Sequence, residues 1–133
     1  MWRSRKMRQN FLVLLGVVAL LSAPARVLAH HGSAAFDMEH GVTLKGTVTE
    51  LLLLNPHVQL HFDVKNEKGQ VESWQAELTA PQRLKRAGWT KDTLKPGDTI
   101  TVTGAPAKDG KHTLWIQKVI GPDGEPMNLG AGE

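Results

Sequence analysis

Apolar and polar residues alternate along much of the chain after residue 41, and this pattern predicts β-strands. The clearest case is residues 57–64, where Val58, Leu60, Phe62 and Val64 share one face and polar side chains occupy the other. Further segments that favour strands are residues 42–54, 71–78, 99–104 and 112–120. Turn residues, including Asn55-Pro56 and Pro96-Gly97-Asp98, separate the segments. The pattern therefore predicts five strands.

The first of these strands contains an interruption. Residues 42–48 alternate, but four consecutive leucines then occupy residues 51–54. Either a β-bulge or burial of both faces explains such a break. We expect a neighbouring element to cover the leucines.

A short helix is predicted between the third and fourth strands. Thr79 can cap it, Pro81 is tolerated in its first turn, and Gly88 ends it. Leu84 and Ala87 point to the same side of this helix, and we expect Trp89 to pack back onto the helix or the sheet. Three strands, a helix and two further strands form the element order of an OB-fold barrel. We therefore expect an all-β, five-stranded OB-like barrel with one short helix; an open β-sandwich of similar size is the alternative.

The N-terminus resembles a secretory signal peptide. A head with four basic residues precedes eleven apolar residues at 11–21, and Val27-Leu28-Ala29 offers a processing site. The apolar run is too short to cross a hydrocarbon core of about 30 Å. We expect residues 1–29 to be removed, residues 30–120 to form the barrel and residues 121–133 to be a loosely ordered tail. The mature protein would be periplasmic or secreted, without a stable membrane anchor. Cleavage after Ala23-Pro24-Ala25 is the alternative.

Removing this leader changes the charge of the protein. The full chain carries 16 basic and 13 acidic residues, a net charge of +3. Residues 1–29 hold five basic and no acidic residues, so the mature chain would carry 11 basic and 13 acidic residues, a net charge of −2. A nucleic-acid partner is not expected, because affinity for phosphates depends on clustered Lys and Arg. The absence of Cys excludes a lipoprotein anchor, disulfides and a thiolate metal site.

Short motifs in a definite order connect the chain to a known family. They are His30-His31-Gly32, Phe36-Asp37, Gly46-Thr47-Val48, Asn55-Pro56-His57, Trp74, Gly88-Trp89-Thr90 and Leu94-Lys95-Pro96-Gly97-Asp98. With these motifs the chain resembles a family of small exported bacterial proteins of unknown function. The resemblance implies an exported OB-like domain and no particular activity. One departure is Leu53, where an aromatic residue is expected before the Asn-Pro-His turn.

Histidines are the residues with the clearest chemical potential. All six follow residue 29. After cleavage at Ala29, the new α-amine and ring of His30 could chelate one metal ion, and His31 offers a rival chelate through the amine, the first amide and its ring. His57 or His40 could supply a further nitrogen, and imidazole suits copper and zinc. The candidate metal ligands are therefore His30, His31, His57 and His40. The alternatives are a solvated terminus for the first two and a turn residue for His57.

The remaining histidines are weaker candidates. His61 lies four residues from His57 on one strand, or roughly 13 Å at ~3.3 Å per residue, which is too far for both rings to share an ion. We expect His61 and His112 to be ordinary exposed strand residues. Trp115 is expected to point outward, where it is either covered by the tail or part of a contact surface.

Three classes of function remain open. The first is metal binding, with copper or zinc as the cofactor. The second is a non-metal binding module for a partner protein, an oligosaccharide or another envelope component, which rests on the fold alone. The third is an enzyme, which we do not expect, because the sequence contains no recognisable nucleophile–base–orienter set and no phosphate-binding loop.

Overall fold

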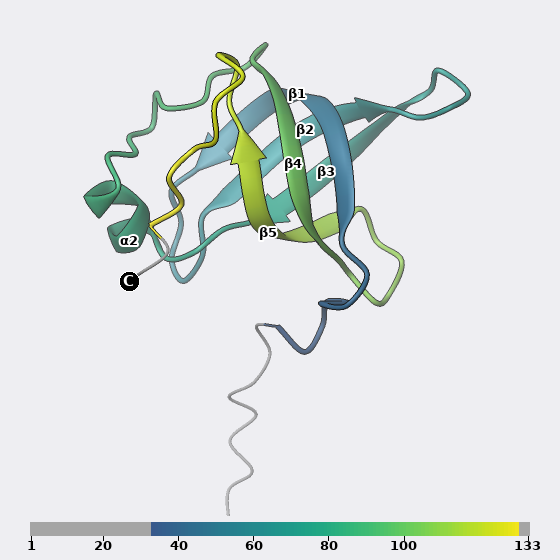
Figure 1. Ribbon diagram of the computed structural model, residues 1–133, viewed down its shortest axis with the longest axis horizontal. Helices are drawn as coiled ribbons and strands as arrows, with labels where there is room; N and C mark the ends of the chain where they lie inside the picture. Colours follow the sequence, from purple (N-terminus) through teal and green to yellow (C-terminus); the bar gives the residue numbers. More distant parts are fainter. Residues whose placement is uncertain (1–32, 131–133) are drawn as a thin grey trace, which may run out of the picture.

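Five strands close into a barrel (Figure 1). The computed structural model describes residues 33–130, so the predicted signal peptide, His30 and His31 lie outside the described residues. The strands are β1 Val42–Leu52, β2 Gln59–Lys65, β3 Val71–Glu77, β4 Thr99–Pro106 and β5 Thr113–Ile120. The one helix of this part of the chain, α2 Pro81–Arg86, lies between β3 and β4. The predicted OB-like barrel with its short helix is thus confirmed, and the open sandwich is excluded.

The order of strands around the barrel is β1-β2-β3-β5-β4. Neighbouring strands pair antiparallel, except at the β3–β5 junction, where a parallel pairing of three residue pairs closes the barrel. Closure through this junction gives each strand two neighbours, which removes most of the exposed edge that a flat sheet would have.

The alternation of β2 produces the core. Val58, Leu60 and Phe62 are fully buried and Val64 nearly so, as the pattern predicts. Each such side chain contributes about 1.5–3 kcal/mol through burial. Side chains from β1, β4 and β5 complete the same cluster, so one core serves the whole barrel.

A bulge explains the interrupted pattern of β1. The register with β2 shifts between Val48 and Glu50, which confirms the first of the two explanations offered above. β1 ends at Leu52, and Leu53 packs partly against the core while Leu54 is exposed. The leucine run is therefore only partly covered.

Two glycines permit close contacts between strands. A Cβ atom on Gly46 would lie 2.6 Å from the Asp63 carbonyl oxygen, and a Cβ on Gly104 would overlap the carbonyl oxygen of Trp115. Gly104 stands at a second register shift, between β4 and β5. The bulge there needs a residue without a side chain, because the neighbouring backbone occupies the space.

The predicted cap of α2 is wrong by one residue. Ala80, not Thr79, is the N-cap, and it makes no side-chain capping bond, whereas Pro81 occupies the first helical position. The fixed φ of proline suits that position and gives the helix a start without a capping hydroxyl. Gly88 follows the helix with a φ of 92°, as expected for a C-terminal glycine.

Hydrogen bonds hold the segment after β5 on the rest of the fold as far as Asn128. The Trp89 indole is buried, and its Nε1 donates to the carbonyl oxygen of Asn128 at 2.6 Å. The amide of Met127 donates to the carbonyl of Val119. The alternation of apolar residues ends before this segment, so the strand pattern does not show that it packs on the barrel. Its attachment depends in part on Trp89, which lies 39 positions before Asn128 in the sequence.

Within residues 33–130, no helix combines the length and the apolar character that a membrane span requires.

Candidate functional site

His57 lies between the Asn55-Pro56 turn and the start of β2, and its ring faces β3. Its Nδ1 is 3.5 Å from Oε2 of Glu77, with both side chains about two-thirds buried (33% and 28% exposed). The β2–β3 register explains the contact: Gln59 pairs with Glu77, so the last residue of β3 lies beside the turn that carries His57. The carboxylate faces Nδ1, which leaves Nε2 as the nitrogen for a ligand.

Trp115 on β5 contacts the same imidazole. The His57 and Trp115 rings meet edge to face, with centroids 5.0 Å apart and an interplanar angle of 84°. Trp115 also pairs with Glu77 across the parallel β3–β5 junction. The tryptophan points outward, as predicted, and it shares a shallow hollow with Leu129 of the tail.

Phe36 brings the chain that precedes β1 to this place. Its ring lies 6.0 Å from Trp115 and is only 5% exposed. An isolated bridge to Ala107 and a hydrogen bond from the Asp37 amide to the Pro106 carbonyl at 2.8 Å fix the segment beside the end of β4. Phe36, Trp115 and His57 therefore form one continuous aromatic contact.

His40 lies apart from this contact. Its side chain is 80% exposed, and Nδ1 is 3.0 Å from Oδ2 of Asp37. The His40 hydrogen bond is the main reason that the pKa of the Asp37 carboxyl lies below its ordinary value of 3.8, and two backbone amides add to this effect. His40 thus closes a local turn. No group of three or more His, Cys, Asp or Glu side chains within residues 33–130 is arranged to hold a metal ion.

His61 is more buried than expected. It faces outward on β2 between Glu50 of β1 and Gln75 of β3, but it is half-buried, and Nε2 has no hydrogen-bond partner among the described residues. The expectation of an ordinary exposed residue was therefore wrong for His61. Side chains of the two neighbouring strands flank a residue in the middle of a sheet, which is why the strand pattern alone overstated its exposure.

His112 lies just before β5 and stacks on Trp74 of β3. The two rings are nearly parallel, at 12° with centroids 4.6 Å apart, and His112 Nε2 is 3.9 Å from Glu72 Oε2. This second aromatic pair belongs to another part of the barrel wall from the His57 pair. His112 remains exposed, as predicted, but its stacking on Trp74 was not predicted.

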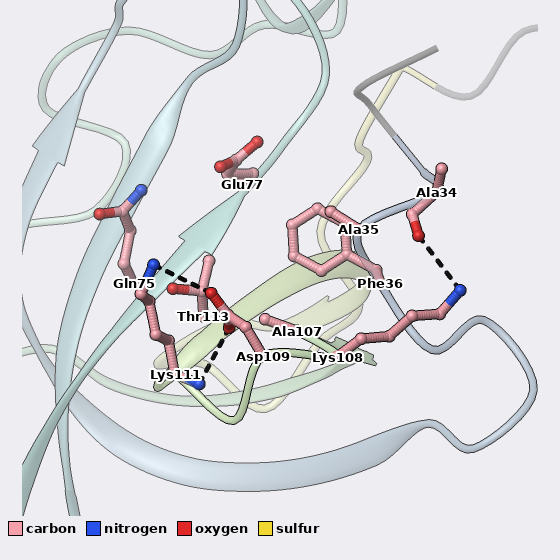
Figure 2. Close-up of a pocket in the computed structure, with 10 residues that line it drawn as sticks. All are labelled: Ala34, Ala35, Phe36, Gln75, Glu77, Ala107, Lys108, Asp109, Lys111 and Thr113. Carbon is pink, nitrogen blue, oxygen red and sulfur yellow. Dashed lines mark hydrogen bonds and ion pairs between the residues drawn. The ribbon is translucent and has the colours of Figure 1, made fainter.

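A groove lies next to the His57–Glu77 pair (Figure 2). It encloses about 400 Å³ between the segment before β1, the turn after β4 and the ends of β3 and β5. The residues that line it are Ala34, Ala35, Phe36, Gln75, Glu77, Ala107, Lys108, Asp109, Lys111 and Thr113. Glu77 therefore belongs both to this groove and to the contact with His57.

Two residues of the site escaped the sequence analysis. Glu77 lies in the segment 71–78 that was predicted to be a strand, but the alternation does not reveal which turn it meets. Phe36 was noted only as part of a motif. An isolated aromatic residue shortly before the first strand is a weak sign that this segment packs against the barrel. It was the one sign of this packing that the sequence offered.

The comparisons with solved structures found weak likenesses. A tRNA fluorescent labelling enzyme aligns with 60% of this chain and 17% of its own, at 21% identity and a TM-score of 0.41. Apo TiaS, a tRNA agmatidine synthetase, gives 23% identity, 60% and 17% coverage, and a TM-score of 0.41. The complex of TiaS with its tRNA, AMPCPP and agmatine gives 22% identity, 63% and 19% coverage, and a TM-score of 0.42.

The chain thus spans less than a fifth of the length of these enzymes. No match was found among curated proteins. A family match, by contrast, covers most of the chain and includes β1 to β4, the helix and the aromatic contact described above. Over residues 17–115 the chain matches the family described as "Family of unknown function (DUF6152)", and it belongs to that family.

Proposed function

We propose that this protein is a small exported metal-binding protein, which holds copper or zinc through His57 and the histidines near its mature N-terminus. It would bind its ligand without converting it. The observation that carries the proposal is the contact of Phe36, Trp115 and His57, because it brings the chain that follows His30 and His31 alongside the half-buried His57.

The surroundings of His57 suit a metal ligand. Metal-binding histidines commonly direct their second ring nitrogen to a carboxylate, which fixes the orientation of the ring and makes the coordinating nitrogen more basic. Glu77 stands opposite Nδ1 at 3.5 Å, so it could act in this way and leave Nε2 for the ion. Trp115 limits rotation of the imidazole from another side.

Chain length permits the N-terminal histidines to reach His57. His31 is five positions before Phe36, and an extended chain spans at most about 3.3–3.6 Å per residue, or roughly 17 Å over that interval. The ring centroids from Phe36 to Trp115 and from Trp115 to His57 are separated by 6.0 and 5.0 Å. A site that combines His57 with the N-terminal amine and the ring of His30 or His31 is therefore within reach.

The proposed ligands are all nitrogen atoms, and this favours particular metal ions. An amine and two or three imidazoles form a nitrogen site, which suits Cu(II) and also accepts Zn(II). The chain has no Cys, so thiolates cannot compete for either ion. His40 lies apart from the aromatic contact, but Asp37 likewise faces only its Nδ1, so its Nε2 is left as a further nitrogen. Export belongs to the same proposal, since removal of residues 1–29 creates the amine that the chelate uses.

Mass spectrometry of the protein purified from the cell envelope would test the proposal first. Native spectra would report retained metal, and denatured spectra would report the mature N-terminus. We expect a chain that begins at His30 and binds one Cu(II) or Zn(II). A different N-terminus, or a chain that stays free of metal during titration with Cu(II), would contradict the N-terminal chelate.

Three variants would identify the ligands. We expect His30→Ala and His57→Ala each to weaken Cu(II) binding more than tenfold in calorimetric titrations. His112→Ala is the matched control, because its ring stacks on Trp74 and not on Trp115. Equal and negligible effects of all three substitutions would refute the assignment.

A further inference from the structure

One edge of β3 has no partner over the first half of the strand. On its other side, β3 pairs with β2 along its whole length, from Val71 to Glu77. Its pairing with β5 covers only Gln75 to Glu77. Within residues 33–130, no strand lies beside residues 71–74 on the β5 side, which we call the open edge. Figure 1 shows this end of the β2–β3 hairpin projecting from the barrel.

The backbone hydrogen bonds show which groups face the open edge. Gln75 donates its amide to the carbonyl of His112 at 2.9 Å, on the side away from β2. Alternate residues of a strand direct their backbone groups to the same side, so Val71 and Ser73 also direct theirs away from β2. Both residues are exposed, and neither is paired on that side in the described part of the chain. The open edge therefore presents two amide donors and two carbonyl acceptors.

Such a row of backbone groups recognises an extended polypeptide, which adds a strand to the sheet. Many proteins block an exposed edge with proline, with lysine or with a bulge. Residues 71–74 contain neither proline nor lysine, and the β2–β3 register beside them runs without a shift. The backbone of the open edge is thus suited to receive a further strand.

Glu72 supplies the one charged side chain of the open edge. Its Oε1 accepts a hydrogen bond from Asn66 Nδ2 at 2.9 Å, which orients the carboxylate. Oε2 lies 3.9 Å from Nε2 of His112, which is a cation only when protonated, and the Glu72 side chain is 32% exposed. The ion pairs among residues 33–130 give Glu72 no Lys or Arg partner. Its charge is therefore available to a cation on an added strand.

The same carboxylate disfavours a second copy of this chain as the occupant. Two identical edges related by a two-fold axis present the same residues to each other and run antiparallel. If both exposed residues of each edge are to bond, Val71 of each copy must lie opposite Ser73 of the other. This register sets Glu72 opposite Glu72, and like charges directly opposite each other destabilise a strand pair. The open edge therefore favours a different chain that carries a cation at this position.

We infer that the open edge of β3 binds an extended segment of a partner protein, with a Lys or Arg of that segment opposite Glu72. Two residues of the segment exchange backbone hydrogen bonds with Val71 and Ser73, and the basic side chain between them pairs with the carboxylate. The Val71 side chain, which is 59% exposed, packs against an apolar residue of the segment. This surface is separate from the proposed metal site, because it uses neither His57 nor Glu77.

An NMR titration of the metal-free, ¹⁵N-labelled protein with the acetylated and amidated pentapeptide Thr-Val-Lys-Val-Thr tests the inference. We expect shifts and slower hydrogen exchange at the amides of Val71 and Ser73, with saturation in the millimolar range. Replacing the lysine of the peptide by glutamate should weaken binding about fivefold, because like charges then lie opposite each other. N-methylation of both peptide valines should abolish binding, since it removes the donors that face the open edge.

Glu72→Lys should reverse the preference, so that the glutamate peptide binds about fivefold more tightly than the lysine peptide. Glu67→Lys is the matched control: it makes the same change of charge in the exposed turn of the same hairpin and should preserve the preference for lysine.

Sedimentation of the protein without peptide should give a monomer. A dimer whose Val71 and Ser73 amides are protected from exchange would overturn the inference in favour of a second copy. Equal binding of the lysine and glutamate peptides, or no binding of either, would also overturn it. Because the protein is free of metal throughout, none of these results depends on the metal proposal.

Discussion

Replacing Phe36 or Trp115 by leucine should reveal how firmly the N-terminal segment is attached to the His57 site. Leucine keeps both positions apolar but removes the aromatic contact between them. The Phe36 ring is 5% exposed, and its centroid lies 6.0 Å from that of Trp115 at an angle of 50°. Both the distance and the tilt fall within the favourable range for aromatic pairs.

The expected magnitude follows from burial and from ring geometry. Phe36→Leu removes three buried carbon atoms net, which at about 0.8 kcal/mol per methylene predicts a loss of about 2 kcal/mol in the free energy of unfolding. The contact between the two rings should contribute about 0.5–1.5 kcal/mol beyond burial. The double variant should therefore be less destabilised than the sum of the single variants by about that amount.

Urea unfolding of the four proteins, followed by far-ultraviolet circular dichroism, provides the assay as a double-mutant cycle. A second cycle with Phe36→Leu and Trp74→Leu is the control, because Trp74 stacks on His112 instead, and these two changes should be additive. A coupling below about 0.3 kcal/mol between Phe36 and Trp115 would refute the ring contact. Without this contact, the segment that carries Phe36 would not be held beside Trp115 and His57.

Three further substitutions test other parts of the structure. Gly104→Ala should destabilise the protein by about 3 kcal/mol or more in thermal unfolding, since the new Cβ meets the backbone of Trp115. Gly41→Ala is the control and should change stability little, because its Cβ would lie 3.5 Å from the nearest atom, the carbonyl oxygen of Gly104. Trp89→Phe should cost about 1–3 kcal/mol and speed amide hydrogen exchange at Met127, because the carbonyl of Asn128 loses its buried donor. A ¹³C NMR titration should place the pKa of the Asp37 carboxyl below 3.8. The stabilisation from its contact with His40 is then present above pH 3.8 and is lost as the pH falls through the lowered pKa. His40→Ala should return the pKa of Asp37 toward 3.8, and an unchanged pKa would exclude His40 as the cause.

Local pattern was sufficient to predict the barrel. The alternation from Val58 to Val64 defined the inner face of β2, and the element order then selected the five-stranded closure. Pro81 and Gly88 indicated where the helix begins and ends, to within one or two residues. The N-cap, however, was predicted at Thr79, and the structure has it at Ala80. These features depend on residues close in sequence, which is why sequence reasoning could reach them.

The site was less predictable, because its contacts join distant segments. Glu77 meets His57 through the β2–β3 register, and Trp74 meets His112 only because β3 and β5 pair in parallel. A shift of one residue in either register would exchange the inward and outward side chains, and the sequence pattern does not determine that register uniquely. Outward positions could therefore be named from the sequence, but their neighbours could not.

The pairing of β1 with β4 has a consequence for the time at which the barrel can form. Val42 pairs with Gly104, 62 positions later, and Gln75 pairs with Thr113, 38 positions later. Domains dominated by such distant contacts fold in milliseconds to seconds, because the cost of closing long loops precedes the gain from pairing. During translation, β1 must wait without its β4 partner until the segment Thr99–Pro106 has left the ribosome. For most of its synthesis the chain therefore stays in an unclosed form, in which the backbone groups of β1 that will bond to β4 remain exposed to solvent.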